Sequence, residues 1–246
     1  MEKNELTVIE HFVELRRRLV FIVVFFLLAM IGSFFLAEPL IVYLQQTDEA
    51  ASLELNAFRL TDPLKIYMQI AFIIACVITS PFVLYQLWAF ISPGLYEKEK
   101  KITLAYIPVS VFLFLSGISF SYFVLFPFIV RFMKQLGDRM EINQVIGINE
   151  YFHFLLQITL PFGLLFQLPV IILFLTRLGI ITPDFLSRVR KYAYFILLVI
   201  AALITPPDVL SHMMVTLPLL LLYEVSIWIS KLAYRKKMKE EEGLAV

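Results

Sequence analysis

Two acidic residues beside long apolar stretches are the side chains best suited to bind a cationic ligand. Glu14 lies four residues before Arg18, just ahead of the first apolar stretch, and Glu99 lies among three lysines. A carboxylate can accept two parallel hydrogen bonds from a guanidinium, and such charge-assisted bonds are strong where the dielectric constant is low. Both residues also have structural interpretations, namely an i,i+4 ion pair of Glu14 with Arg18, worth about 0.3–0.5 kcal/mol, and a solvated loop charge at Glu99. Spacing alone favours these structural interpretations.

Polar side chains inside the apolar stretches form a second set of candidates, because polar and ionisable groups within a membrane are often functional. They are Gln69, Gln86, Gln157, Gln167 and Glu224. Pro169 removes a helical hydrogen bond to the carbonyl of Leu165, and the side chain of Gln167 could satisfy that exposed backbone. This structural role and a functional role for Gln167 are equally open. Glu224 lies seven residues before Lys231, roughly 10 Å along a helix, so it can reach the membrane interface.

Enzymatic motifs are absent from the sequence. It contains no P-loop, no His-Glu-x-x-His zinc pair and no Gly-x-Ser-x-Gly nucleophile turn. His11, His153 and His212 are too scattered to indicate a metal site. Cys76 is the single cysteine, so no disulfide can form within the chain. We therefore expect no enzyme activity, no cofactor and no metal.

These candidates depend on helices that cross a membrane. The chain is 60% hydrophobic and 17% charged, and its mean hydropathy of +0.84 is far above that of a soluble domain. Its apolar residues fall into six stretches, at 19–37, 66–90, 102–130, 151–176, 192–205 and 209–230. We expect an all-α, polytopic membrane bundle of six transmembrane helices, a single domain over 1–246 with a charged cytoplasmic tail at 235–246. Prolines predict kinks within or near the ends of the helices, at Pro108, Pro127, Pro161, Pro169 and Pro218.

The fifth stretch is unusually short. Fourteen residues separate Lys191 from Pro206, and at about 1.5 Å per residue they span roughly 21 Å, less than a hydrocarbon core of about 30 Å. The purely apolar part of the sixth stretch ends before Glu224 and is short as well. We expect this hairpin, which turns at Pro206, Pro207 and Asp208 on the periplasmic side, to thin the bilayer.

Orientation follows from the positive charges, because short cytoplasmic loops of membrane proteins retain Lys and Arg. With six crossings both termini lie on one side, and 16 of the 21 Lys and Arg residues fall on that side. We therefore expect both termini to lie in the cytoplasm, with 38–65 and 131–150 on the far side. The N-terminal segment carries four glutamates and lacks a small-residue cleavage site, so we do not expect a removable signal peptide.

Four motifs lie at the predicted helix ends and loops. The first, EHFVELRRR, occupies 10–18, and the second, SPF followed by QLWAFISPGLYEKEK, occupies 80–100. The third consists of FG and FQLP within 162–169, and the fourth is LITPPDV at 203–209. At these places, and in span count and loop order, the chain resembles the TatC family, the receptor subunit of twin-arginine protein translocation. The likeness covers nearly the whole chain.

The resemblance implies a cytoplasmic surface that binds signal peptides with paired arginines. Glu14 and Glu99 are expected to bind the two guanidiniums, whose planar geometry lysine cannot copy. Further residues are expected to shape the surface, namely Leu15, Arg16, Phe90, Pro93 and Tyr96. The family commonly has Glu where this chain has Gln167, and an amide cannot bind and release protons.

Residues and resemblance together predict the receptor and core scaffold of a protein translocase. The absence of a nucleotide-binding motif indicates that the chain does not hydrolyse nucleotides, and the resemblance implies that the proton motive force drives transport in the bacterial inner (plasma) membrane. Expected partners are twin-arginine signal peptides of precursor proteins, small single-span TatA/TatB-type subunits, membrane lipid and further copies of the chain, and no nucleic acid is expected. A secondary transporter of a small solute is the alternative, although we find no internal repeat of the kind such transporters use. An intramembrane hydrolase would need a nucleophile and base at a recognisable spacing, which the sequence lacks.

Overall fold

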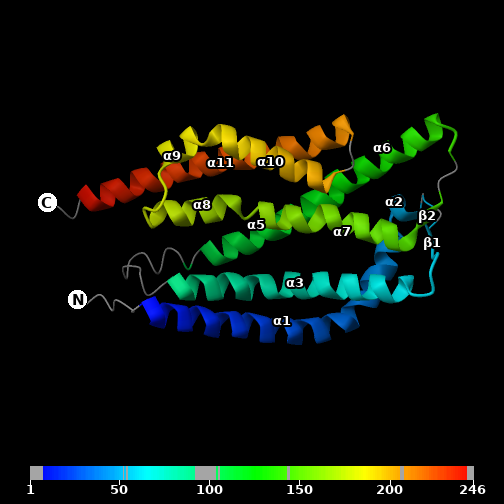
Figure 1. Ribbon diagram of the computed structural model, residues 1–246, viewed down its shortest axis with the longest axis horizontal. Helices are drawn as coiled ribbons and strands as arrows, with labels where there is room; N and C mark the ends of the chain where they lie inside the picture. Colours follow the sequence, from blue (N-terminus) through cyan, green and yellow to red (C-terminus); the bar gives the residue numbers. More distant parts are fainter. Residues whose placement is uncertain are drawn as a thin grey trace. The chain divides into compact units, whose positions relative to one another are not determined.

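The computed structural model describes residues 8–51, 53, 55–91, 104, 106–142, 145–205 and 208–242. Within these ranges the chain is almost entirely helical (Figure 1). The longer helices are α1 (Val8–Gln45), α3 (Asp62–Ile91), α5 (Tyr106–Phe120), α6 (Phe126–Arg139), α7 (Ile148–Leu165), α8 (Leu168–Arg177), α10 (Arg190–Ile204) and α11 (Val209–Glu242). The short elements are α2 (Asp48–Ala51), the π-helical segment η2 (Ser121–Leu125), α9 (Pro183–Arg188) and two strands, β1 (Leu55–Asn56) and β2 (Ile146–Gly147).

Five helical segments in the described ranges are long and apolar enough to cross a membrane. They are Phe12–Gln45, Asp62–Phe90, Tyr106–Arg139, Ile148–Arg177 and Val209–Met238. The predicted helical, membrane-spanning fold class is thereby confirmed. The remaining apolar helix, α10, has 15 residues and extends about 22 Å, less than a hydrocarbon core of about 30 Å. α11 continues through Glu224 to Glu242, so its apolar part is short but the helix is not.

The break between α7 and α8 follows from Pro169. α7 ends at Leu165, and α8 begins at Leu168 with Pro169 in its first turn. Because proline has no N–H to donate, the carbonyl of Leu165 loses its usual helical partner and the helix is interrupted. Pro161 and Pro218, in contrast, lie inside continuous helices. The kink predicted at Pro169 is therefore a two-residue break between α7 and α8, at Phe166 and Gln167.

The chain forms two compact units, and the first comprises Met1–Val111 and Val130–Leu156. In it, α1 packs along α3. Phe25 stacks on Phe82 with ring centroids 4.4 Å apart, and the hydroxyl of Tyr67 donates to the carbonyl of Phe34 at 2.5 Å. Small side chains let membrane helices approach closely, and both helices bury such residues completely, namely Ser33, Ala37, Ala71 and Ala75.

The second unit comprises Phe112–Ile129 and Gln157–Val246. Glycine allows α5 and α7 to approach closely, since a Cβ on Gly117 would lie 2.7 Å from the carbonyl oxygen of Phe162. Helices α8 and α11 are joined by a buried hydrogen bond of 2.8 Å between the hydroxyls of Thr176 and Ser230. Hydroxyl pairs of this kind connect helices where no water is available to bond them.

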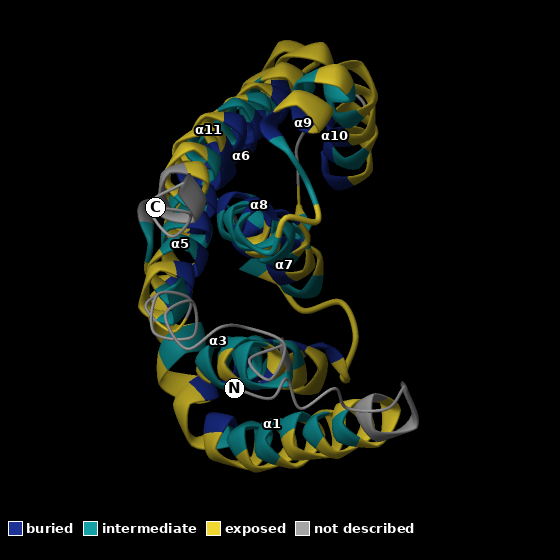
Figure 2. Ribbon diagram, turned by 90° about the vertical axis from the view of Figure 1, so that its left-hand side faces the viewer, coloured by how far each residue is buried: buried dark blue, intermediate teal, exposed yellow. Residues whose placement is uncertain are grey.

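Large apolar side chains cover the outer faces of several helices. On α1, Leu28 is 63% exposed and Phe35 is 81% exposed, and on α11 Trp228 is 63% exposed. Figure 2 shows exposed residues along α1 and α11. A soluble protein rarely exposes so many large apolar residues, so these faces are suited to contact lipid.

Candidate functional site

The first turns of α1 carry the expected ligand-binding residues of the N-terminal motif. Leu15 is 41% exposed, Arg16 is exposed, and Glu14 is half-buried. Phe90, in the last turn of α3, is also half-buried. All four belong to the first compact unit. Two exposed side chains and a half-buried carboxylate on one helix end leave a surface that a peptide can reach.

Glu14 is engaged by Arg18 within the same helix. Nη2 of Arg18 lies 2.5 Å from Oε1 of Glu14, and Nη1 of Arg18 donates to Oε1 of Gln86 on α3 at 3.1 Å. Gln86 is only 8% exposed. The i,i+4 pair that spacing favoured is therefore formed, and Arg18 additionally connects α1 to α3.

Three of the expected site residues, Pro93, Tyr96 and Glu99, lie outside the described residues. The second acidic side chain of the expected binding surface is among them. The role assigned to these three residues, and the pairing of Glu14 with Glu99, stay predictions.

Gln167 occupies the interruption between α7 and α8. It is 9% exposed, and its carbonyl accepts hydrogen bonds from the N–H groups of Val170 and Ile171, both about 3 Å long. Its side chain makes no capping hydrogen bond to α8. Gln167 therefore starts α8 through its backbone carbonyl, and the two roles considered for its side chain from the sequence stay predictions.

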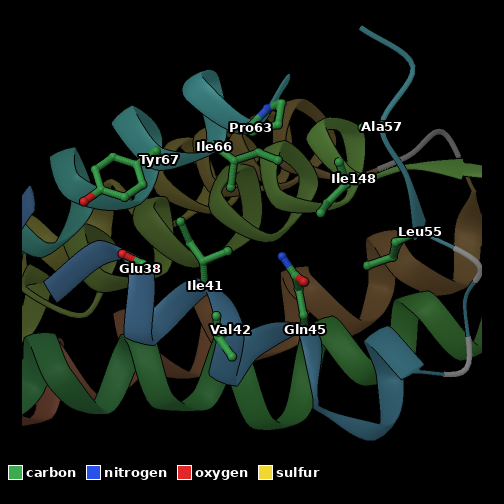
Figure 3. A pocket seen from close by; sticks show the side chains of 10 residues that line it. All are labelled: Glu38, Ile41, Val42, Gln45, Leu55, Ala57, Pro63, Ile66, Tyr67 and Ile148. Atoms are coloured by element: carbon green, nitrogen blue, oxygen red, sulfur yellow. The ribbon is translucent and has the colours of Figure 1, made fainter. Parts of the chain in front are cut away.

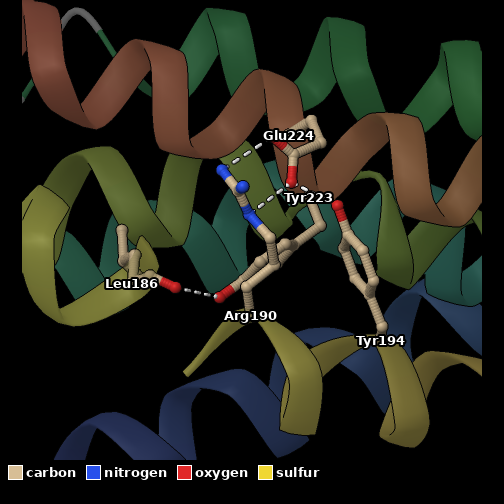
Figure 4. Close-up of polar contacts among 5 residues, drawn as sticks. All are labelled: Leu186, Arg190, Tyr194, Tyr223 and Glu224. Atoms are coloured by element: carbon tan, nitrogen blue, oxygen red, sulfur yellow. Dashed lines mark hydrogen bonds and ion pairs between the residues drawn. The ribbon is translucent and has the colours of Figure 1, made fainter. Parts of the chain in front are cut away.

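Glu224 binds two side chains of α10 (Figure 4). Its carboxylate accepts two contacts from Arg190, with Nε 2.9 Å from Oε1 and Nη2 3.1 Å from Oε2. The hydroxyl of Tyr194 also donates to Oε1. Next to Glu224, Tyr223 donates its hydroxyl to the carbonyl of Leu186 at 3.0 Å. These contacts attach α10 and the preceding α9 to α11.

Sequence reasoning did not identify Arg190 and Tyr194 as partners of Glu224. A usable signal was present, because Arg190 and Glu224 each lie 17 positions from Pro207, at the predicted hairpin turn. Residues equally distant from a tight turn lie opposite each other in an antiparallel helix pair. The symmetric spacing of two opposite charges therefore predicts their ion pair.

The predicted hairpin turn is described only at Asp208, since Pro206 and Pro207 lie outside the described residues. Oδ1 of Asp208 accepts from the N–H of Ser211 at 2.7 Å, and its carbonyl accepts from the N–H of His212 at 3.1 Å. This is the N-cap arrangement favoured by aspartate. Asp208 therefore starts α11.

A cavity of about 380 Å³ lies in the first unit, between the end of α1, the start of α3 and the strand region (Figure 3). Its lining is mainly apolar, and its polar side chains are Glu38, Gln45 and Tyr67. The hydroxyl of Tyr67 is already bonded to Phe34. Among the described residues, no group of three His, Cys, Asp or Glu side chains is placed to hold a metal ion.

Comparison with known proteins identifies similar chains of full length. The family model described as Sec-independent protein translocase protein (TatC) matches residues 10–218. The chain is 67% identical over 239 residues to Sec-independent protein translocase protein TatCy of Bacillus subtilis, covering 97% of this chain and 94% of the relative. It is 59% identical over 242 residues to the TatC protein of Halalkalibacterium halodurans, with 98% and 96% covered. A crystal structure of the twin arginine translocase receptor TatC is similar with a TM-score of 0.81 and 35% identity, covering 91% of this chain and 99% of that one.

Proposed function

The chain belongs to the TatC family of Sec-independent protein translocase proteins, and on that premise we propose that it is the membrane receptor for twin-arginine signal peptides. It is a multi-pass membrane protein by its five apolar helices and its family. The observation that carries the proposal is the similarity over 91% of the chain to a structure described as the twin arginine translocase receptor.

The proposed binding surface combines the start of α1 with the segment that follows α3. Glu14 and Glu99 bind the guanidiniums of the paired arginines, and further residues shape the surface, namely Leu15, Arg16, Phe90, Pro93 and Tyr96. The exposure of Leu15 and Arg16 on α1 supports this surface. Each carboxylate can accept the parallel N–H donors of one arginine, which a lysine ammonium does not present.

The proposed receptor is also the core scaffold of the translocase. It faces the cytoplasm with both termini, in the bacterial inner membrane, and assembles with small single-span TatA/TatB-type subunits and with further copies of itself. The proton motive force drives transport, and the chain itself has no enzymatic role. The hairpin of α10 and α11, held by Glu224 at one end and started by Asp208 at the other, contributes structure rather than proton transfer, and Gln167 cannot carry protons either.

The proposal is tested by the affinity of the purified protein for a signal peptide and for the same peptide with both arginines changed to lysine. A charge-assisted hydrogen bond contributes about 1.5–3 kcal/mol, so Glu99→Gln should weaken binding of the arginine peptide tenfold or more. Glu99→Lys should nearly abolish binding, because it places a like charge against the arginines. Both variants should insert and fold.

The comparison of the two peptides decides whether Glu99 reads the arginines. Wild-type protein should bind the lysine peptide much more weakly than the arginine peptide. The Glu99→Gln protein should bind the two peptides with nearly the same affinity. If both proteins lose the same fraction of binding, Glu99 does not read the arginines and this part of the proposal is wrong. Crosslinking of the peptide to probes along 10–18 and 95–101 provides the spatial control, since a solute transporter would give no adducts there.

A further inference from the structure

Arg18 offers Glu14 the same chemical group as the proposed ligand. We infer that Arg18 is an internal competitor of the signal peptide: it occupies Glu14 in the empty receptor, and an arginine of the peptide takes its place. This inference rests on the proposed function, since it requires Glu14 to bind a ligand arginine. Arg18 and Gln86 then determine affinity by acting on Glu14 and are positioning residues.

The geometry holds the guanidinium of Arg18 between two acceptors. One terminal nitrogen contacts Glu14 at 2.5 Å, and the other donates to Gln86 at 3.1 Å. A guanidinium presents its donors in a fixed plane, so these two contacts together set its orientation. Its position on Oε1 of Glu14 is a position that a ligand guanidinium would use.

The three consecutive arginines of the motif differ in their surroundings. Arg16 is exposed, and the guanidinium carbon of Arg17 lies over the ring of Phe21, 5.5 Å from its centroid. Arg18 lies one helical turn after Glu14 and contacts its carboxylate. Of these three arginines, we therefore expect Arg18 to compete with the peptide for Glu14. Arg17, which carries the same charge one residue away, serves as the control.

Displacement of Arg18 is energetically accessible. The side chains of Arg18 and Glu14 are 18% and 30% exposed, and ion pairs of this partly exposed kind shift an equilibrium by no more than about fivefold. Nε of Arg18 is buried and has no hydrogen-bond partner among the described residues. While Arg18 contacts Glu14, one of its N–H donors is therefore unused. Gln86 lies on a different helix from Glu14 and can keep its hydrogen bond to Arg18 after the exchange, which avoids leaving a buried guanidinium without an acceptor.

The experiment is a double-mutant cycle on peptide affinity with the full chain in lipid nanodiscs and a labelled twin-arginine signal peptide as the probe. Arg18→Gln should tighten binding about fivefold, because it removes a competitor of the strength given above. The same change in a Glu14→Gln background should alter affinity less than twofold. Arg17→Gln removes the same charge without freeing Glu14, so it should change affinity less than Arg18→Gln does.

Gln86→Leu supplies an independent variant for the same inference. This substitution removes the acceptor that Gln86 offers to the displaced guanidinium of Arg18. It should therefore weaken peptide binding in the wild-type background and leave peptide affinity unchanged in the Arg18→Gln background. A direct contact between Gln86 and the peptide would weaken binding equally in both backgrounds. That result would overturn the proposed role of Gln86 as a positioning residue.

The outcomes separate the inference from the proposed function. If Glu14→Gln leaves the affinity of the wild-type protein unchanged, Glu14 does not bind the ligand and both ideas are wrong. If Glu14→Gln weakens binding while Arg18→Gln has no effect or weakens it too, the receptor assignment stands and the competition is refuted. Equal tightening by Arg18→Gln with and without Glu14 would also refute it, since the effect would then be general charge repulsion.

Discussion

Arg190 and Glu224 join α10 to α11 through two nitrogen–oxygen contacts of 2.9 and 3.1 Å. The two side chains are 40% and 39% exposed, so solvent screens the attraction. Tyr194 adds a hydroxyl donor to the same carboxylate. A bidentate pair that accepts a further hydrogen bond stabilises a protein more than a single-contact surface ion pair does. Because this pair is partly exposed, we expect its contribution to the free energy of unfolding to lie near the upper end of the range for surface ion pairs, about 1 kcal/mol.

We predict a coupling energy of about 1 kcal/mol between Arg190 and Glu224. Arg190→Ala, Glu224→Ala and the double variant should give non-additive losses in the free energy of unfolding, measured by denaturant titration in mixed micelles. Arg188→Ala serves as the control, because Arg188 is exposed on α9 and should be additive with Glu224→Ala. Additive losses for the Arg190 pair would mean that the contact does not stabilise the hairpin.

The helix α10 is short compared with the thickness of a membrane. Its 15 residues reach about 22 Å against a hydrocarbon core of about 30 Å. Its ion pair with α11 lies near the first residue of α10, while the hairpin turn follows its last residue. We predict that the bilayer around this hairpin is locally thinner, since the two helices cannot slide past each other without breaking the pair.

We predict that lengthening the hairpin lowers transport but leaves signal-peptide affinity intact. Four apolar residues, about one helical turn, are inserted within α10 and four more within α11 between Val209 and Glu224. The paired insertion keeps Arg190 opposite Glu224 while the hairpin grows by about 6 Å. Transport is measured with a folded reporter precursor in cells, and peptide binding is measured on the purified protein.

An insertion of four residues near the end of α11, beyond Arg235, is the matched control for added length. It leaves the hairpin unchanged and should not alter transport. Transport that survives the paired insertion at the wild-type rate would show that the short hairpin, and any thinning of the bilayer, is dispensable.

At the scale of the whole molecule, orientation decides which surface meets newly made precursor proteins. The positive charges predict that both termini lie in the cytoplasm, and the proposed binding surface comprises the N-terminal end of α1 and the segment that follows α3 in the sequence. With that predicted orientation, the cavity at the opposite ends of these helices faces outward. The receptor proposal requires this orientation.

We predict that single cysteines at positions 98 and 188 are protected from an impermeant thiol reagent in intact cells, while one at position 59 is labelled. Native Cys76 is first replaced by alanine, so that each variant contains one thiol. Permeabilised cells should label all three positions, which controls for accessibility. Labelling of position 98 or 188 from outside would reverse the topology and remove the binding surface from the cytoplasm.

The helical membrane fold and the family could be recognised from the sequence, because hydropathy, proline positions and short motifs are local properties of the chain. The interruption at Pro169, the short α10 and the i,i+4 pair of Glu14 with Arg18 follow from rules that act over one or two helical turns. Such features need no knowledge of which helices are neighbours.

Only the tertiary structure decided which polar groups meet across helices. Gln86 reaches Arg18 from 68 positions away, and Arg190 and Tyr194 meet Glu224 from 34 and 30 positions away. Inside an apolar environment each such group needs a partner, but many apolar helix faces are interchangeable, so the sequence alone does not select the pairing. The rotation and register of the packed helices select the pairing. They bring Gln86 to the arginine that binds Glu14, and they bring Arg190 and Tyr194 to Glu224.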